Sequence, residues 1–142
     1  MGKKRIIKKG GQDSGNKSAS GSRVPKKKIE HGILNIEATY NNTKVSLADT
    51  NGNILLWSSS GSLSFSGSKK GTPFAAGKVG ELIADKGISM GLKDVDVVIR
   101  GVGSGRESAM RAFAAKGINI LSIKDRTPVP FNGPKPPKPR RV

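Results

Sequence analysis

Apolar and polar residues alternate in the manner of half-buried β-strands from Ile33, and the pattern resumes at residues 45–48 and 54–57. The dipeptide Asn51-Gly52 separates the last two segments. It predicts a tight hairpin turn, whose two central positions both need positive φ. The pattern therefore predicts a three-stranded antiparallel meander over about residues 32–60.

The apolar spacing becomes helical after Thr72-Pro73, which has the form of an N-cap followed by proline in the first helical position. A buried strand is expected at residues 95–99. Ser104 and Glu107 then have the spacing of a capping box for a second helix, which Gly117 closes. A last strand over residues 118–123 completes the order βββ-α-β-α-β, an α/β domain with a mixed sheet.

Two further expectations concern packing. Gly77, Gly80 and Gly87 each weaken the first helix by up to ~1 kcal/mol relative to alanine, so we expect them where the helix packs closely on the sheet. Trp57 ends an apolar strand, which favours a place in the core. Stacking of Trp57 or Phe65 on nucleic-acid bases is the alternative.

Charge divides the chain into three parts. Residues 1–30 hold ten Lys and Arg against two acids, residues 31–125 hold eleven against eight, and residues 126–142 hold five and no acid. We expect a basic N-terminal arm, an α/β domain and a basic C-terminal tail, with a polyanion as partner. A membrane is the poorer partner, since no apolar run approaches the ~20 residues that span a bilayer.

The residue types argue against an enzyme, a metal site or a bound cofactor. The chain has no cysteine, its one histidine, His31, has no partner nearby in the sequence, and its acids are scattered over different elements. Ile6-Ile7 is too short for the apolar core of a signal peptide. The N-terminus leaves two interpretations open, a basic arm of a cytoplasmic protein and an organellar transit segment.

The turn at residues 101–106, the glycine turn, lies between a predicted strand and a predicted helix. Its glycines would let backbone N–H groups approach a phosphate at a helix N-terminus, and Arg106 could grip that phosphate with two hydrogen bonds. A purely structural turn is the alternative. A dinucleotide site would also need Asp125 for the ribose, but the third glycine of its fingerprint is missing.

Two further loops could bind phosphate or ribose. The segment at residues 66–71, the cationic turn, combines Lys69 and Lys70 with hydroxyls and free amides; a solvated loop is the alternative. The segment at residues 41–43, Asn-Asn-Thr, offers three small polar side chains, but it also suits a simple turn.

The tail, residues 126–142, contains six of the eight prolines. Proline makes such a segment stiff and extended, so that docking it on a polyanion costs little ordering entropy. Residues 136–141 also fit the P-x-x-P-x-R pattern of an SH3 ligand, a short motif with many false positives.

Several long motifs together resemble the universal small-subunit ribosomal protein eleven family in its bacterial form. The resemblance covers nearly all of residues 31–142. It is carried by the Trp57 strand end and by NIEATYNNTKVSLAD at 35–49, GSKKGTPFAAGK at 67–78, GVGSGRESAMRA at 101–112 and TPVPFNGPKPPKPRRV at 127–142.

The resemblance implies a ribonuclease-H-like fold without nuclease activity, on the platform of the small ribosomal subunit. It implies a protein that bridges separate rRNA helices and lines the cleft holding the duplex between messenger RNA and the rRNA 3′ end. It also implies contact with ribosomal proteins seven and eighteen and a place near the site of initiation factor three. The chain departs from the family pattern, which usually has prolines at Val102 and Ser104, a basic residue at Ser66, histidine at Phe131 and Cys-Arg at Pro134-Lys135.

We therefore expect a structural, non-enzymatic rRNA-binding protein of a cytoplasmic or organellar ribosome. A free-standing cytoplasmic RNA chaperone or regulator is the alternative. The residues expected to contact RNA are Lys26, Lys27, Lys28, Asn41, Asn42, Thr43, Gly67, Ser68, Lys69, Lys70, Thr72, Gly101, Gly103, Gly105, Arg106, Arg126, Thr127, Asn132, Gly133, Lys135, Lys138, Arg140 and Arg141.

Overall fold

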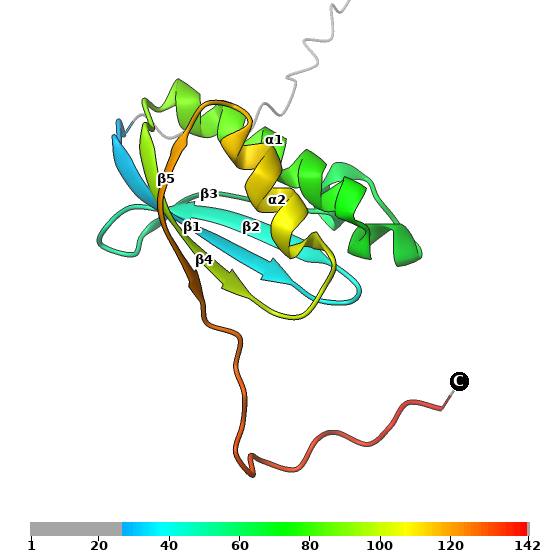
Figure 1. The fold of residues 1–142 in the computed structure, drawn as a ribbon. Helices are drawn as coiled ribbons and strands as arrows, with labels where there is room; N and C mark the ends of the chain where they lie inside the picture. The colour runs from blue at the N-terminus through cyan, green and yellow to red at the C-terminus, as the bar shows by residue number, and fades with distance from the viewer. Residues whose placement is uncertain (1–26, 142) are drawn as a thin grey trace, which may run out of the picture.

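A computed structural model describes residues 27–141, in which two helices cover one face of a five-stranded sheet (Figure 1). The predicted order of strands and helices is confirmed, and two 3₁₀ turns stand where the sequence predicted loop. The elements are β1 (His31–Ala38), β2 (Thr43–Ala48), β3 (Ile54–Ser59), η1 (Gly61–Leu63), η2 (Gly67–Gly71), α1 (Pro73–Ser89), β4 (Asp94–Arg100), α2 (Gly105–Ala114) and β5 (Asn119–Asp125).

The sheet is mixed, with the strand order β3-β2-β1-β4-β5. The pairs β1–β2 and β2–β3 are antiparallel, whereas β1–β4 and β4–β5 are parallel. A parallel pair needs a crossover connection, and α2 supplies it between β4 and β5. The parallel strands β1, β4 and β5 therefore all end at the same edge of the sheet.

The core lies between the sheet and the two helices. Leu34 and Ile36 of β1 and Val97 of β4 are fully buried there, as are Ile83 of α1 and Phe113 of α2. Ile29, which the sequence placed in the basic arm, is also buried in this cluster, and its N–H donates to the Met90 carbonyl. No element within residues 27–141 covers the opposite face, which we call the open face (Figure 1).

Trp57 lies on the open face, so the expectation that it belongs to the core is wrong. Its side chain is 68% exposed, whereas its neighbours Leu56 and Ser58 are buried against the helices. Side chains alternate between the two faces of a strand. Trp57 pairs with Ser46, so the two side chains point to the same face of the sheet. Trp57, like Ile54 at the start of the strand, is an apolar residue of β3 that lies outside the core.

The β2–β3 hairpin is present, but its turn is not the predicted two-residue one. Only Gly52 in this loop has a positive φ, of 91°. The Asp49 carboxylate organises the loop by accepting hydrogen bonds from the N–H groups of Asn51 and Asn53, at 3.0 and 2.9 Å. Lys27 donates to the same carboxylate at 2.7 Å, and this bond is the main cause that holds the pKa of Asp49 well below its usual range.

Helix α1 begins as the sequence predicted, since the Thr72 hydroxyl accepts a hydrogen bond from the Ala75 N–H at 3.3 Å. The glycine expectation is partly wrong. A Cβ at Gly80 would meet the Ala109 carbonyl of α2, so this glycine permits close packing of the two helices rather than of helix on sheet. A Cβ at Gly87 would lie 3.2 Å from Leu92 and 3.5 Å from Leu47 of β2. None of the described helices is long and apolar enough to cross a bilayer.

Candidate nucleic-acid interface

Three of the predicted RNA-binding segments meet at the edge where β1 and β4 end. Gly71 of the cationic turn lies against the backbone of Tyr40, and Gly103 of the glycine turn lies against Thr39. The Ser104 hydroxyl donates a hydrogen bond of 2.8 Å to the Gly71 carbonyl and so joins these two turns. The carboxyl end of parallel strands is where ligands bind in open α/β sheets. We call this region the carboxyl edge.

The Asn-Asn-Thr segment is a turn held by backbone hydrogen bonds of Asn42. The Thr39 hydroxyl and N–H bond to the backbone of Asn42. Thr43 has no exposed surface, so its side chain cannot reach an RNA, and that expectation is wrong. The Asn42 side-chain oxygen and the Thr43 hydroxyl are buried without a partner among residues 27–141. Asn41 is exposed and is the side chain of this segment that an RNA can reach.

The cationic turn forms the 3₁₀ helix η2. Gly67 has a positive φ of 59°, and the Thr72 hydroxyl donates a hydrogen bond of 2.7 Å to the Lys69 carbonyl. Ser68 and Lys69 are exposed, and neither Lys69 nor Lys70 makes an ion pair within the described part of the chain. Both ammonium groups therefore remain able to bind phosphate.

Sequence reasoning singled out Phe65 beside this turn but missed Phe74 and Tyr40. The exposed Phe74 ring packs edge-on against Phe65 at 6.1 Å between centroids, and the Lys78 ammonium lies 5.6 Å from its centroid. Tyr40, next to Gly71, is 78% exposed. The sequence did contain a signal for Phe74. It directly follows Pro73 and so lies in the first turn of the helix, outside the apolar stripe that packs on the sheet.

The glycines of the glycine turn are explained by contacts inside the protein. A Cβ at Gly101 or Gly103 would clash with the carbonyls of Ala38 and Thr39, and one at Gly105 would clash with Thr43. The N–H of Gly103 donates to the Ala38 carbonyl at 2.9 Å, and that of Gly101 donates to the Thr127 hydroxyl at 3.2 Å. Gly103 and Gly105 are buried, so in this conformation the turn does not present the predicted nest of free N–H groups.

The expected capping box of α2 is also wrong. The Ser104 side chain makes no capping bond, because its hydroxyl is used by Gly71. Glu107 instead lies 3.1 Å from Arg111, one helical turn further on. A capping box requires both side chains to turn back on the first helical turn, and here a tertiary contact outcompetes it.

Arg106 fastens the start of the tail to the domain. Its guanidinium donates hydrogen bonds to the Asp125 carboxylate, to the Gly101 carbonyl and, at 3.3 Å, to the Thr127 hydroxyl. Asp125 also accepts from the N–H and the hydroxyl of Thr127, at 2.9 and 2.6 Å. We call this cluster of Arg106, Asp125, Thr127 and Gly101 the Arg106 latch.

The latch changes the role expected for Arg106. Its guanidinium is engaged by protein oxygens, so the predicted two-bond grip on a phosphate does not describe this conformation. The hydrogen bonds from Thr127, followed by those from Arg106, hold the pKa of Asp125 well below its usual range. Asp125 therefore stays ionised at neutral pH and keeps Arg106 paired.

Beyond the latch, the tail runs away from the sheet without secondary structure (Figure 1). Every residue from 128 to 141 is exposed, and Asn132 has a positive φ of 61°. The cations of residues 126–141 make no ion pair with any described residue. They are Arg126 within the latch region and Lys135, Lys138, Arg140 and Arg141 beyond it.

The comparison with protein families identifies what this arrangement belongs to. The family model described as ribosomal protein S11 matches residues 32–141, which include the sheet, both helices and the tail. The chain belongs to the ribosomal protein S11 family. Members of this family are structural proteins of the small ribosomal subunit that bind rRNA, and they are not enzymes.

This S11-family protein carries cations before β1 as well as after β5. Lys28 is exposed before β1, whereas Lys27 is paired with Asp49; Lys26 lies outside the described residues.

His31 has a partner that the sequence did not predict, because its ring lies 3.1 Å from the Asp96 carboxylate on the neighbouring strand. The Ser122 hydroxyl, and after it His31, lower the pKa of Asp96. Among the described residues, no three His, Cys, Asp or Glu side chains gather as metal ligands.

Proposed function

We propose that this S11-family protein occupies the platform of the small subunit, bridges separate rRNA helices, and lines the cleft that holds the duplex of messenger and rRNA. The observation that carries the proposal is the arrangement of free cations. Lys69 and Lys70 at the carboxyl edge, and four cations along residues 135–141 of the tail, point outward and lack carboxylate partners among the described residues.

The mechanism is neutralisation of phosphates at two separate places. The domain places the cationic turn on one RNA helix through the carboxyl edge. The tail, which leaves the same edge in a direction that the Arg106 latch sets, reaches a second. Most of these contacts suit phosphate and ribose, so reading of bases is a minor part of this surface.

The proposed contact set keeps the sequence prediction with three changes. Thr43 leaves it because it is buried, and Arg106 becomes a residue that positions the tail. Gly101, Gly103 and Gly105 shape the turn, and the N–H groups of Gly101 and Gly103 are bound inside the protein. The other predicted residues remain proposed contacts, among them Lys26, Lys28, Asn41, Thr72, Asn132 and Gly133.

The remaining proposals follow from the family. The sheet, with its order β3-β2-β1-β4-β5 and one antiparallel inner strand, supports a ribonuclease-H-like topology. We also propose that the protein contacts ribosomal proteins seven and eighteen, lies near initiation factor three, and belongs to a cytoplasmic ribosome. We also include the division into an arm at 1–30, a domain at 31–125 and a tail at 126–142.

Sedimentation of cell extracts tests the proposal. Nearly all of the protein should migrate with small subunits, even in moderately high salt, and a mostly free pool would contradict it in favour of a free-standing RNA binder. Chemical footprinting of small-subunit rRNA with and without the protein then tests the platform. Protection should fall on at least two separate rRNA helices, and truncation of the tail should remove one of these protections.

A further inference from the structure

We propose that the open face of the sheet holds one unpaired RNA base against Trp57. The inference rests on the proposed function, since it names a base-binding site on a protein that otherwise contacts backbone. It concerns the open face, outside the loops of the carboxyl edge and the tail beyond Thr127. Trp57 is the only tryptophan in the sequence, and its side chain is exposed.

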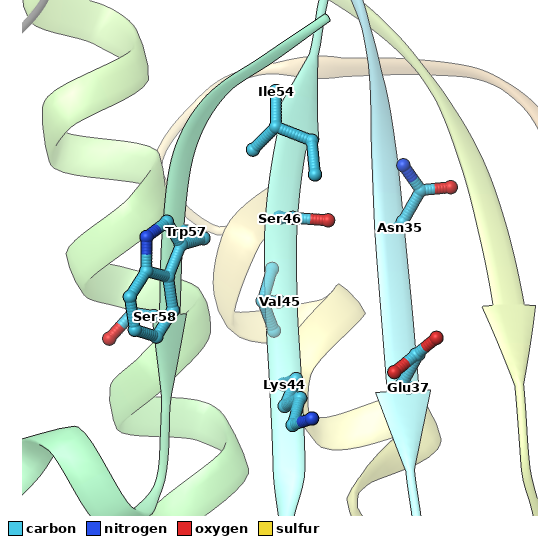
Figure 2. Close-up of a pocket in the computed structure, with 8 residues that line it drawn as sticks. All are labelled: Asn35, Glu37, Lys44, Val45, Ser46, Ile54, Trp57 and Ser58. Carbon is cyan, nitrogen blue, oxygen red and sulfur yellow. The ribbon is translucent and has the colours of Figure 1, made fainter. Parts of the chain in front are cut away.

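Strand register places the side chains around Trp57 in a single row across the open face. Trp57 pairs with Ser46 of β2, Ser46 pairs with Asn35 of β1, and Asn35 pairs with Val98 of β4. Figure 2 shows the indole at the outer side of β3, toward α1, with the short Ser46 side chain on the neighbouring β2 and Asn35 on β1. Paired strands lie about 4.8 Å apart, so a flat ring beside the indole would cover Ser46 and reach the Asn35 amide.

A shallow hollow of about 250 Å³ lies along this row. Trp57 and Ile54 provide its apolar wall, and Asn35, Ser46 and Lys44 provide its polar groups. This volume is below the roughly 300–1,000 Å³ of sites for drug-sized ligands, which suits one ring system rather than a whole cofactor. The side chains of Asn35 and Ser46 have no hydrogen-bond partner among the described residues, so both are able to bind the edge of a base.

The charges on this face favour an anionic ligand. Of the acids near the hollow, Glu37 is paired with Arg100 at 3.4 Å, whereas Asp96 is hydrogen-bonded to His31 and Ser122. Its cations Lys44, Lys124 and Arg126 are exposed and make no ion pair within residues 27–141. Asp94 accepts a hydrogen bond from Asn119 at the far end of the face. Lys44, Lys124 and Arg126 outnumber the carboxylates Asp94 and Asp96, so the net charge around the hollow is positive and complements the phosphate that a bound nucleotide carries.

A protein side chain is the competing occupant, because an exposed indole also suits a protein interface. A partner chain selected by apolar contact alone would use Ile54 as much as Trp57, since Ile54 is 63% exposed and lines the same hollow. A stacked base would depend on the π-face of Trp57 and on the Asn35 amide. This difference separates the two occupants.

The fluorescence of the full chain tests the inference, because Trp57 is the sole source of indole emission. Purified small-subunit rRNA and a single-stranded RNA octanucleotide should quench this emission, and a duplex of the same length should not. Trp57→Ala should weaken octanucleotide binding by roughly 5- to 100-fold, the range found for loss of one stacked base. Ile54→Ala trims the apolar wall and should weaken binding less than Trp57→Ala does, and Asn35→Ala should reduce the quenching. The control Ile88→Ala, whose exposed side chain lies on α1 outside the hollow, should change binding less than twofold.

The outcomes distinguish this inference from the function on which it rests. If rRNA binds with tail-dependent affinity while the emission of Trp57 does not change, the base site is wrong and the proposed function stands. If a small-subunit protein quenches the emission and rRNA does not, the open face is a protein interface. If neither the full chain nor its variants bind rRNA, the proposed function itself fails.

Discussion

The glycine turn and the tail are two regions that the sequence marked equally as RNA contacts, and the structure treats them differently. The glycine turn uses the N–H groups of Gly101 and Gly103, the Ser104 hydroxyl and the Arg106 guanidinium inside the protein. The tail keeps its cations exposed and unpaired with any described residue. Glycines before a helix are therefore a weak sign of phosphate binding when close contacts inside the protein already explain each of them.

The largest effect should come from removing residues 128–142, which keeps the latch but deletes Lys135, Lys138, Arg140 and Arg141. The slope of log affinity for small-subunit rRNA against log salt should fall in magnitude by about 3, because each lost phosphate contact contributes roughly 0.7–0.9. Filter binding at several salt concentrations measures this slope. The unfolding midpoint of the domain should not change, and an unaltered salt slope would show that the tail is not a phosphate-binding segment.

The glycine turn should respond through folding rather than through RNA. Gly103→Ala places a Cβ against the Thr39 carbonyl and should lower the free energy of unfolding by about 1–3 kcal/mol. Urea denaturation of the full chain provides the measurement. Gly61→Ala is the matched control, because its Cβ would meet nothing closer than 3.7 Å and its stability should stay within about 0.5 kcal/mol. Equal stability of the two variants would contradict the packing explanation.

The Arg106 latch links the two regions, and its loss should matter only while the tail is present. Arg106→Ala should weaken rRNA binding of the full chain about fivefold. Without the latch the tail leaves the domain in many directions, so that binding must order it and costs more conformational entropy. The same substitution should have no effect in a chain that ends at Thr127. Equal losses in both backgrounds would identify Arg106 as a direct phosphate contact. Arg111→Ala, on the same helix, controls for the lost charge.

The smallest effect concerns pH. The pKa of Asp125 is lower in the folded protein than its unfolded value of about 3.9, so its contribution to stability is fully present above pH 4–5 and is lost as pH falls further. The stability advantage of the parent chain over Asp125→Asn should therefore be constant from about pH 5 to 8 and shrink toward pH 3. Urea midpoints at these pH values measure it. An advantage that grew on acidification would contradict the ionised latch.

The sequence predicted the elements well because their signals are local. Alternation identified β1 to β3, and Thr72-Pro73 marked the start of α1 to the residue. It failed where a distant residue decides the outcome. Ser104 has the spacing of a cap but bonds to Gly71, and Gly80 lies against Ala109 of the other helix. In each case a partner about thirty positions away in the chain outcompetes the local pattern.

The functional residues divide in the same way. Charge, proline content and family motifs, all properties of the chain itself, determined that this protein carries a cationic tail and belongs with rRNA. Only the tertiary structure decided that Thr43 is buried, that Arg106 holds Asp125, and that Trp57 lies on the open face. The physical reason is that charge and apolar spacing can be read along the chain itself. The contacts of a side chain depend instead on which distant strand or loop folding brings beside it.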